Sequence, residues 1–304
     1  MTPASAYGDC RFMTGRAMTR RIAALDPVID HEEITHLSTG VRYGDPLFVH
    51  AAYTIAFARQ VAIPSISRIV YRAGTGDMMR NVRQRNSDTL LFFGEMLRNG
   101  HSSAHGRAVI DRMEQIHARF GITDDDKLYT LGSLAFEADR ILASLDLDVF
   151  TGAERLARYL FWRGVGERMG LDVPATRAEF FAWTLDYERR HYASTEGGQA
   201  LVAQLLVDWE QRWFPPRLRR FAAPVMLALL DEPLRAVHRL PDPPKYVSAN
   251  ISRVVRPYLA VAAARPHNPN RSWSDYFGAA HRRPLNVETL GHRAPSTHEQ
   301  AESV

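Results

Sequence analysis

The sequence predicts an all-α protein, and three observations support this prediction. Apolar residues recur at helical spacing through most of the chain between residues 18 and 264. Helix-start signals precede several of these segments, among them Asp45-Pro46 and the capping boxes Thr151–Glu154 and Thr176–Glu179. No run of alternating β-branched residues stands between turn signals, so we expect almost no sheet.

The expected helices begin and end at local signals. Asp45 caps a helix over 47–61, and Pro64 restarts a shorter helix that ends before Gly74. Thr123 caps a helix whose first turn, residues 124–126, is acidic and suits the positive end of the helix dipole. Further helices are expected over 83–97, 103–120, 124–145, 151–170, 176–192, 198–213, 217–230 and 248–264.

The chain divides into one helical domain and two irregular ends. Residues 18–264 form the expected domain, which is long enough to bury a sizeable core. Residues 1–17 contain no periodic apolar pattern, and residues 265–304 are rich in Pro, His and Arg. We therefore expect both ends to be disordered.

Charge and length exclude two classes of protein. The net charge is +4, but removing residues 1–25 and 265–304 leaves a body with 29 basic and 29 acidic residues. A neutral body without a basic stripe argues against nucleic-acid binding. The longest apolar stretch, residues 221–230, is interrupted by Pro224 and is too short to span a membrane. We expect a cytoplasmic protein without integral membrane association.

Cysteine and several histidine patterns offer little chemistry. Cys10 is the one cysteine, which excludes a disulfide framework and a thiolate metal cage. His31 and His36 are five residues apart and off a common helix face, so we interpret them as part of a solvated helix start. His101 and His105 share a face, but no third ligand is apparent nearby, and a surface turn is the preferred interpretation.

One Glu-x-x-His pattern and one lone histidine remain. Glu188 and His191 fit a di-iron spacing once, whereas such sites need a second copy, so an exposed helix is favoured. His117 lies on the apolar face of its helix, where burial requires partners for its nitrogens. A metal on one nitrogen and a backbone hydrogen bond are both open. Arg85 and Thr89 share a face of the preceding helix, and ordinary surface or backbone contacts explain them equally well.

Several segments together resemble the MpaB oxygenase and rubber-oxygenase (latex clearing protein) catalytic domain. They lie in matching order within roughly residues 20–260. The segments are Leu25-Asp26-Pro27, Tyr43-Gly44-Asp45-Pro46, 85–91, 112–117, 125–131 and 163–170 followed by Val173-Pro174.

This resemblance implies an all-α, globin-like multi-helix bundle that encloses haem b within a single domain. It implies that His117 is the iron ligand and that Arg85 and Thr89 line the pocket for haem and O2. Members cleave carbon–carbon double bonds of isoprenoid chains with O2. We therefore expect a haem-b-dependent oxygenase that acts on an apolar, unsaturated substrate.

The chain departs from the rubber-oxygenase pattern at two places. Asp88 stands where those enzymes carry the Lys that can occupy the sixth iron position, directly before the Thr. Glu114 and Gly121 stand where Arg residues flank the family's His, so Arg112 and Arg119 are the candidate partners for the haem propionates. An apolar pocket is expected from Phe92, Phe93, Phe120, Tyr129 and Leu134.

Two other functions stay open at this point. One is a non-catalytic haem- or lipid-binding helical protein, in which Asp88 marks altered chemistry. The other is a helical interaction protein without a cofactor, in which His117 is a satisfied core residue. A haem absorption band separates the second from the others, and O2 consumption separates an oxygenase from a binding protein.

Overall fold

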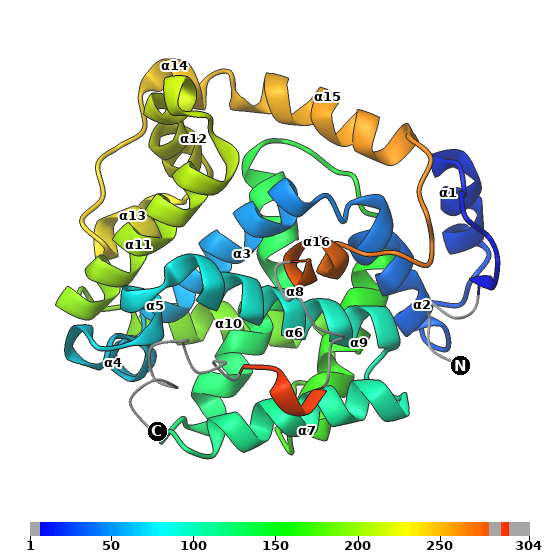
Figure 1. The fold of residues 1–304 in the computed structure, drawn as a ribbon, viewed down its shortest axis with the longest axis horizontal. Helices are drawn as coiled ribbons and strands as arrows, with labels where there is room; N and C mark the ends of the chain where they lie inside the picture. The colour runs from blue at the N-terminus through cyan, green and yellow to red at the C-terminus, as the bar shows by residue number, and fades with distance from the viewer. Residues whose placement is uncertain (1–6, 280–286, 292–304) are drawn as a thin grey trace, which may run out of the picture.

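The computed structural model describes residues 7–279 and 287–291, and these residues form a single α-helical body (Figure 1). Within this part of the chain the only β-type pairing is an isolated antiparallel bridge between Met13 and His267. The predicted all-α, single-domain architecture is confirmed. No helix in the described residues is long and apolar enough to cross a membrane.

The main helices agree closely with the sequence prediction. They are α3 (Pro46–Val61), α4 (Pro64–Tyr71), α6 (Val82–Asn99), α7 (Ala104–His117), α8 (Asp124–Ser144), α9 (Gly152–Arg168), α10 (Arg177–His191), α11 (Glu196–Trp213) and α15 (Ile251–Ala264). Both predicted capping boxes are present, with Thr151 and Thr176 each exchanging hydrogen bonds with the Glu three residues later. These starts were predictable because capping depends on neighbours in sequence.

The shorter elements fill the spaces between these helices. They are α1 (Gly15–Ala23), α2 (His31–Thr35), the π-helix η2 (His36–Arg42), the 3-10 helix η3 (Arg72–Gly74), α5 (Asp77–Arg80), the 3-10 helix η4 (Pro216–Phe221), α12 (Ala222–Leu229), α13 (Glu232–Val237), α14 (Lys245–Ser248), α16 (Ser274–Gly278) and the 3-10 helix η5 (Val287–Thr289). The single helix expected over 217–230 is therefore two elements, η4 and α12.

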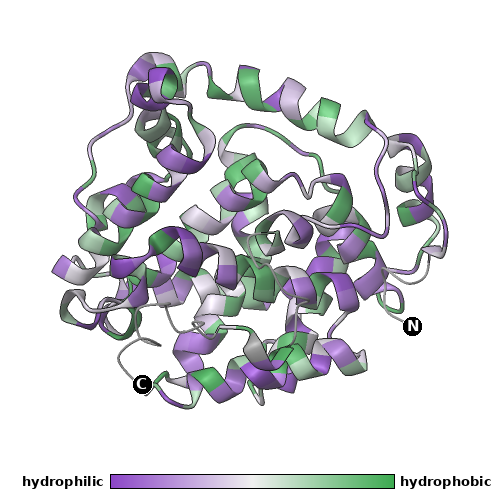
Figure 2. Ribbon diagram, in the orientation of Figure 1, coloured by the Kyte–Doolittle hydropathy of each residue, from purple (hydrophilic) through white to green (hydrophobic). Residues whose placement is uncertain are grey.

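Helix α3 lies in the interior of the body, between α8 and α11 (Figure 1). Twelve of its sixteen residues are buried, as expected for a helix that is apolar on most of its surface. Hydropathy colouring shows apolar residues on the inward faces of the surrounding helices and polar residues outside (Figure 2). One large cluster of buried apolar side chains joins α3, α6, α8, α9 and α11.

Residues 7–17 and 265–279, near the two ends of the chain, are more ordered than composition predicts. Met13 and His267 exchange backbone hydrogen bonds of 2.7 and 2.9 Å, which hold residues before α1 against the segment after α15. Trp273 and Phe277 are buried, and α16 packs on α6 at Gly94. The expectation of disorder is thus wrong for residues 7–17 and 265–279, because these aromatic side chains bury enough apolar surface to order the segment. The other residues that were expected to be disordered, 1–6 and 280–304, lie outside the described residues, apart from 287–291.

Candidate active site

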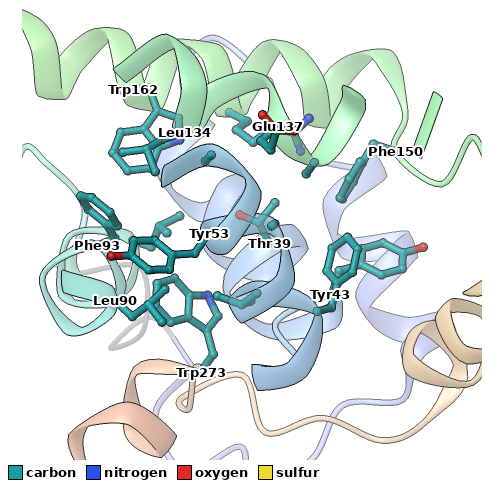
Figure 3. A pocket seen from close by; sticks show the side chains of 17 residues that line it. Thr39, Tyr43, Tyr53, Leu90, Phe93, Leu134, Glu137, Phe150, Trp162 and Trp273 are labelled. Atoms are coloured by element: carbon teal, nitrogen blue, oxygen red, sulfur yellow. The ribbon is translucent and has the colours of Figure 1, made fainter. Parts of the chain in front are cut away.

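An apolar cavity lies between α3, α6, α8 and α9, and Trp273 borders one side of it (Figure 3). Its empty space amounts to about 700 Å³, including the part that is open to solvent. Most of the lining is aromatic or aliphatic, so the cavity suits an apolar molecule. The lining residues are Thr39, Tyr43, Phe48, Val49, Ala52, Tyr53, Ala56, Leu90, Phe93, Leu97, Leu134, Glu137, Ala138, Phe150, Arg158, Trp162 and Trp273.

Glu137 supplies a carboxylate to this apolar lining. Its Oε2 accepts a 2.6 Å hydrogen bond from Nε of Arg59, and both side chains are 3% exposed. Its Oε1 is buried and has no hydrogen-bond partner among the described residues. Burial raises the pKa of Glu137 above its usual value, although Arg59 and Arg140 oppose this effect. The cavity therefore contains a carboxyl oxygen that is free to interact with a bound molecule.

Arg158 faces the same cavity but is held by other groups. Its Nε donates to the Ala135 carbonyl at 3.1 Å, and its Nη2 lies 2.6 Å from Asp139 Oδ1. Its guanidinium also stacks over the Phe150 ring, 4.5 Å from the ring centroid. Because Asp139 compensates its charge, Arg158 contributes rigidity to the wall more than free charge.

Tyr53 connects the cavity to α6. Its hydroxyl donates to Asn86 Oδ1 at 3.2 Å, and Asn86 in turn donates to Asp208 at 2.7 Å. Burial raises the pKa of Tyr53 to about 12, in spite of the nearby charge of Arg85 and a hydrogen bond with Thr89. The hydroxyl therefore stays protonated near neutral pH at the boundary between the cavity and the start of α6.

The predicted pair Arg85 and Thr89 does share one face of α6. Nη1 of Arg85 donates to Oγ1 of Thr89, whose hydroxyl also donates to the Arg85 carbonyl at 3.0 Å. Asp88, on the neighbouring face, accepts a 2.7 Å hydrogen bond from Gln84 Nε2. Leu90, Phe93 and Leu97, from the middle and second half of α6, line the cavity, whereas Arg85 and Thr89 do not. The pair lies near the cavity through Tyr53, which lines the cavity and interacts with both residues.

His117 ends α7, and its side chain is half-buried, with 28% exposed. Its Nδ1 lies 3.1 Å from Glu114 Oε1, and Glu114 Oε2 accepts from Lys127 Nζ at 2.9 Å. Burial opposes ionisation of Glu114, but the hydrogen bonds from His117 and Lys127 outweigh it, so the pKa of Glu114 lies below its usual value. An ionised Glu114 fixes the proton on Nδ1 and leaves Nε2 of a neutral His117 as an electron-pair donor.

The two predicted propionate partners differ in burial. Arg112 is buried, and its Nε donates to the Leu290 carbonyl at 3.3 Å while its Nη2 has no hydrogen-bond partner among the described residues. Arg119 lies in the exposed segment after α7. Only Arg112 therefore combines burial with an unused donor.

The pocket lining predicted from sequence is correct in part. Phe93 and Leu134 line the cavity, whereas Phe92, Phe120 and Tyr129 do not. Phe120 lies under the Arg72 guanidinium, and Tyr129 bonds to Glu188 at 3.2 Å. The prediction missed Glu137 and Tyr53, although a carboxylate between Phe136 and Ala138 on an otherwise apolar helix face was a visible signal.

Two interpretations of titratable residues require correction. Glu188 is buried, and it binds Arg140 through hydrogen bonds of 2.6 and 3.0 Å, so it does not belong to an exposed face. His36 is fully buried in the π-helix η2, with Nε2 bonded to the Pro269 carbonyl at 2.8 Å. His36 is therefore packed and not solvated, because the segment after α15 covers it.

The chain is similar to known proteins in sequence and in fold. The sequence profile described as "ER-bound oxygenase mpaB/B'/Rubber oxygenase, catalytic domain" matches residues 41–264. The ER-bound oxygenase mpaB of Penicillium roqueforti (strain FM164) is 28% identical over 194 residues, which cover 57% of this chain and 65% of that protein. The ER-bound oxygenase mpaB of Penicillium brevicompactum is 25% identical over 153 residues, covering 45% of this chain and 39% of that protein.

A solved structure of latex clearing protein in the closed state shows the same fold. Its TM-score is 0.55 at 18% identity, and the alignment covers 90% of this chain and 71% of that chain. The chain thus spans less than two thirds of the curated relatives it matches, and the structural likeness concerns the fold.

Proposed function

The chain belongs to the family of mpaB and rubber-oxygenase catalytic domains, and from this premise we propose that it is a haem-b-dependent oxygenase that uses O2 on an apolar, unsaturated substrate. The observation that carries the proposal is the apolar cavity beside α6, the helix that also bears Arg85 and Thr89. An isoprenoid chain is the substrate class that we propose, by analogy with rubber oxygenase.

The donor chemistry of His117 fits an iron ligand. A metal-binding histidine usually donates its other ring N–H to a carboxylate, which fixes the tautomer and raises the basicity of the ligand. Glu114 occupies this position relative to Nδ1 at 3.1 Å. Nε2 is then the atom that would bind haem iron, and the unused Nη2 of buried Arg112 would hold a propionate.

Haem, when bound, supplies the iron chemistry that activates O2. The chain's own residues then have three tasks. The aromatic lining excludes water and holds the substrate's apolar chain. Arg85 offers its remaining N–H donors, and Thr89 orients the guanidinium by accepting from Nη1. Glu137 Oε1 is placed to accept a proton or a hydrogen bond from a substrate group, because no group of the described residues occupies it.

Asp88 distinguishes this chain from rubber oxygenases, because it offers no amine near Thr89. We expect ferrous protein to be five-coordinate or water-bound at rest and to bind CO readily. A six-coordinate low-spin spectrum with two protein ligands would contradict this arrangement. The replacement also favours a second candidate, a non-catalytic haem- or lipid-binding protein, which would show the same spectrum without O2 consumption.

The decisive experiment starts from protein that is expressed with adequate haem supply. We expect one non-covalent haem b per chain, seen as a Soret band, and O2 uptake with a polyprenyl substrate. His117→Ala should lose haem while the far-UV circular dichroism stays helical. His105→Ala is the matched control on the same helix and should retain haem. Purified wild type without a Soret band would refute the cofactor assignment.

Variants at α6 separate catalysis from cofactor retention. Arg85→Ala and Thr89→Ala should lower O2 uptake more than they lower haem content, because we place both side chains on the oxygen side of the pocket. The measurement is haem occupancy and O2 consumption on the same preparations. Full activity in both variants would show that the pocket lies elsewhere.

A further inference from the structure

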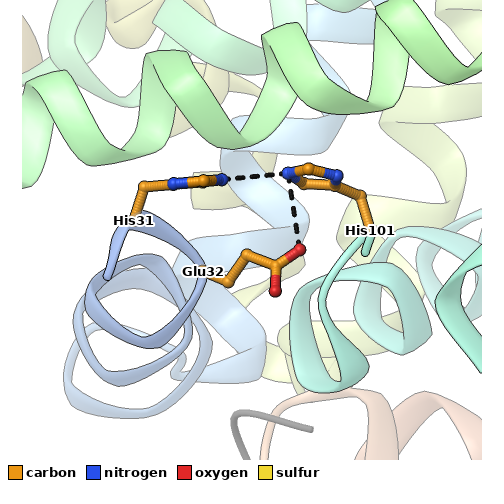
Figure 4. Close-up of side chains that lie close together, drawn as sticks. All are labelled: His31, Glu32 and His101. Carbon is orange, nitrogen blue, oxygen red and sulfur yellow. Dashed lines mark hydrogen bonds and ion pairs between the residues drawn. The ribbon is translucent and has the colours of Figure 1, made fainter. Parts of the chain in front are cut away.

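Three side chains that could bind a metal ion converge at the start of α2 (Figure 4). His31 and Glu32 open α2, and His101 comes from the turn between α6 and α7, seventy residues away along the chain. The Nε2 atoms of the two histidines are 3.0 Å apart, and Nε2 of His101 lies 3.4 Å from Glu32 Oε1. The candidate ligand atoms all lie within 4.8 Å of one another.

These separations match a tetrahedral ion. Zinc binds histidine nitrogen at about 2.0–2.1 Å, so two tetrahedral ligand atoms are roughly 3.3 Å apart. The observed separations of 3.0 and 3.4 Å lie on either side of this value. The two ring planes are 21° apart, and the rings must rotate for both electron pairs to point at one ion.

The protein orients two of the three candidate ligands, His31 and Glu32, through their other atoms. Nδ1 of His31 lies 2.9 Å from the Val28 carbonyl, which can only accept a hydrogen bond, so Nδ1 carries the proton and Nε2 carries the electron pair. The backbone N–H of Ser102 donates to Glu32 Oε1 at 2.7 Å, and its hydroxyl donates to Oε2 at 2.8 Å. Such outer contacts are typical of metal ligands.

Two glycines leave the space that these ligands occupy. A Cβ at Gly164, on α9, would lie 2.2–2.3 Å from ring atoms of His101. A Cβ at Gly100 would lie 2.5 Å from Glu32 Oε2, and the backbone there has a φ of +76°, which favours glycine. Phe161, also on α9, packs edge-on against the His101 ring. The histidine and the carboxylate are therefore held in place from several elements.

We propose that His31, Glu32 and His101 bind one Zn²⁺ ion, which ties α2 to the α6–α7 turn and leaves a fourth position for water. Two imidazoles and one carboxylate suit zinc, whereas Mg²⁺ and Ca²⁺ prefer oxygen ligands. His101 lies in the turn between α6 and α7, as the sequence predicted, but its side chain is only 16% exposed, and the other candidate ligands come from α2 instead of from His105. This site lies at the opposite end of the α6–α7 hairpin from Arg85 and His117, so the proposal does not rest on the oxygenase function.

The test measures zinc bound to the full-length holoprotein. Protein is treated with chelator, dialysed against micromolar ZnCl2 and analysed for zinc, with iron determined in parallel so that haem is counted separately. We expect one tightly bound zinc per wild-type chain. His31→Gln/His101→Gln should lower the affinity at least about tenfold, because both nitrogen ligands are lost. Zinc that binds at other histidines is common to both proteins and cancels in the comparison.

Two single variants sharpen the result. His105→Gln is the control, because His105 is one turn away and pairs with Glu95 at 3.2 Å. It should bind zinc as the wild type does. Gly164→Ala should weaken binding without removing a ligand, because its methyl group displaces the His101 ring.

Thermal unfolding supplies an independent readout. Zinc should raise the melting temperature of the wild type and of His105→Gln, but not that of the double variant. If the double variant does not fold, Glu32→Gln decides the question by the same two measurements. A wild type that binds no stoichiometric zinc, or ligand variants that bind it with unchanged affinity, would overturn the proposal.

Discussion

Replacing Arg59 by Met should destabilise the protein strongly, because it leaves Glu137 buried without a compensating charge. Arg59 donates to Glu137 Oε2 at 2.6 Å and to Asp231 Oδ2 at 2.7 Å. Asp231 keeps a second contact, with Arg140 at 3.4 Å, whereas Glu137 has no other ion pair in the described chain. Methionine retains the apolar stem of the arginine side chain, so the change removes charge more than volume.

The expected loss is about 3–5 kcal/mol in the free energy of unfolding, the range for breaking a buried ion pair by removing one partner. Both side chains are 3% exposed, so solvent screens the lost interaction little. The double variant Arg59→Met/Glu137→Leu should recover at least about 2 kcal/mol of this loss, because no buried charge then lacks a partner.

The loss should also depend on pH in a definite direction. Burial raises the pKa of Glu137 even in the presence of Arg59, and without Arg59 the pKa should rise further. A carboxyl group whose pKa is higher in the folded than in the unfolded state takes up protons on folding. Its cost to the free energy of folding is absent below the pKa of the unfolded state and grows as pH rises toward the pKa of the folded state. Arg59→Met should thus be closest to the wild type in stability at acidic pH.

Urea unfolding followed by circular dichroism and by tryptophan fluorescence measures these differences, provided that the two transitions coincide. The control is Arg163→Met, which removes the exposed ion pair with Glu167 and leaves the Arg59–Glu137 contact intact. A loss below about 1 kcal/mol in Arg59→Met would refute the reasoning. Equal losses in Arg59→Met and the double variant would refute it as well.

Three further predictions follow from other buried groups. Burial opposes ionisation of Asp208, but a hydrogen bond from His50 and other contacts lower its pKa to about 2. The free energy of unfolding should therefore fall by roughly 2 kcal/mol as pH drops from about 4 to about 2. Asp208→Asn should reduce this dependence on pH, measured by urea unfolding. Gly94→Ala should loosen α16 and Trp273, because its Cβ would lie 2.5 Å from Ser274, and limited proteolysis after residue 265 should accelerate. Ala56→Leu should fill the cavity, lowering O2 uptake with a polyprenyl substrate while the Soret band and, within about 1.5 kcal/mol, the stability are retained.

Sequence predicted the helices well where their signals were local. The start of α3 at Pro46 and the two capping boxes depend on residues within one turn, and all were found. The segment around Trp273 was missed, because its order comes from packing on α6, nearly 180 residues earlier in the chain. The π-helix over residues 36–42 was missed for a similar reason, since His36 is stabilised there by the Pro269 carbonyl.

In the candidate site, too, local features were predicted from sequence and long-range contacts were missed. The pair Arg85 and Thr89 was found because a spacing of four residues places two side chains on the same face of a helix. The cluster of His31, Glu32 and His101 was not recognised from sequence, because two histidines in separate segments reveal nothing of their distance until the chain folds. Family resemblance selected His117 as the candidate iron ligand, whereas its contact with Glu114, at 3.1 Å, became visible only in the structure.

The polar residues of α3 show why Glu137 could not be assigned from sequence. His50, Arg59 and Gln60 are buried in a helix that is apolar on most of its surface, and each finds its partner on another helix. These partners are Asp208 on α11, Glu137 on α8 and Ser133 on α8, at 3.1, 2.6 and 2.8 Å. Each of these polar residues was visible in the sequence as an exception on an apolar face. Assigning its partner requires the relative positions of α3, α8 and α11, which the sequence does not give. Glu137 binds Arg59 of α3 through Oε2, whereas Oε1 has no hydrogen-bond partner among the described residues. Because Glu137 also lines the cavity, the same contact that joins α8 to α3 holds this carboxyl group at the cavity wall.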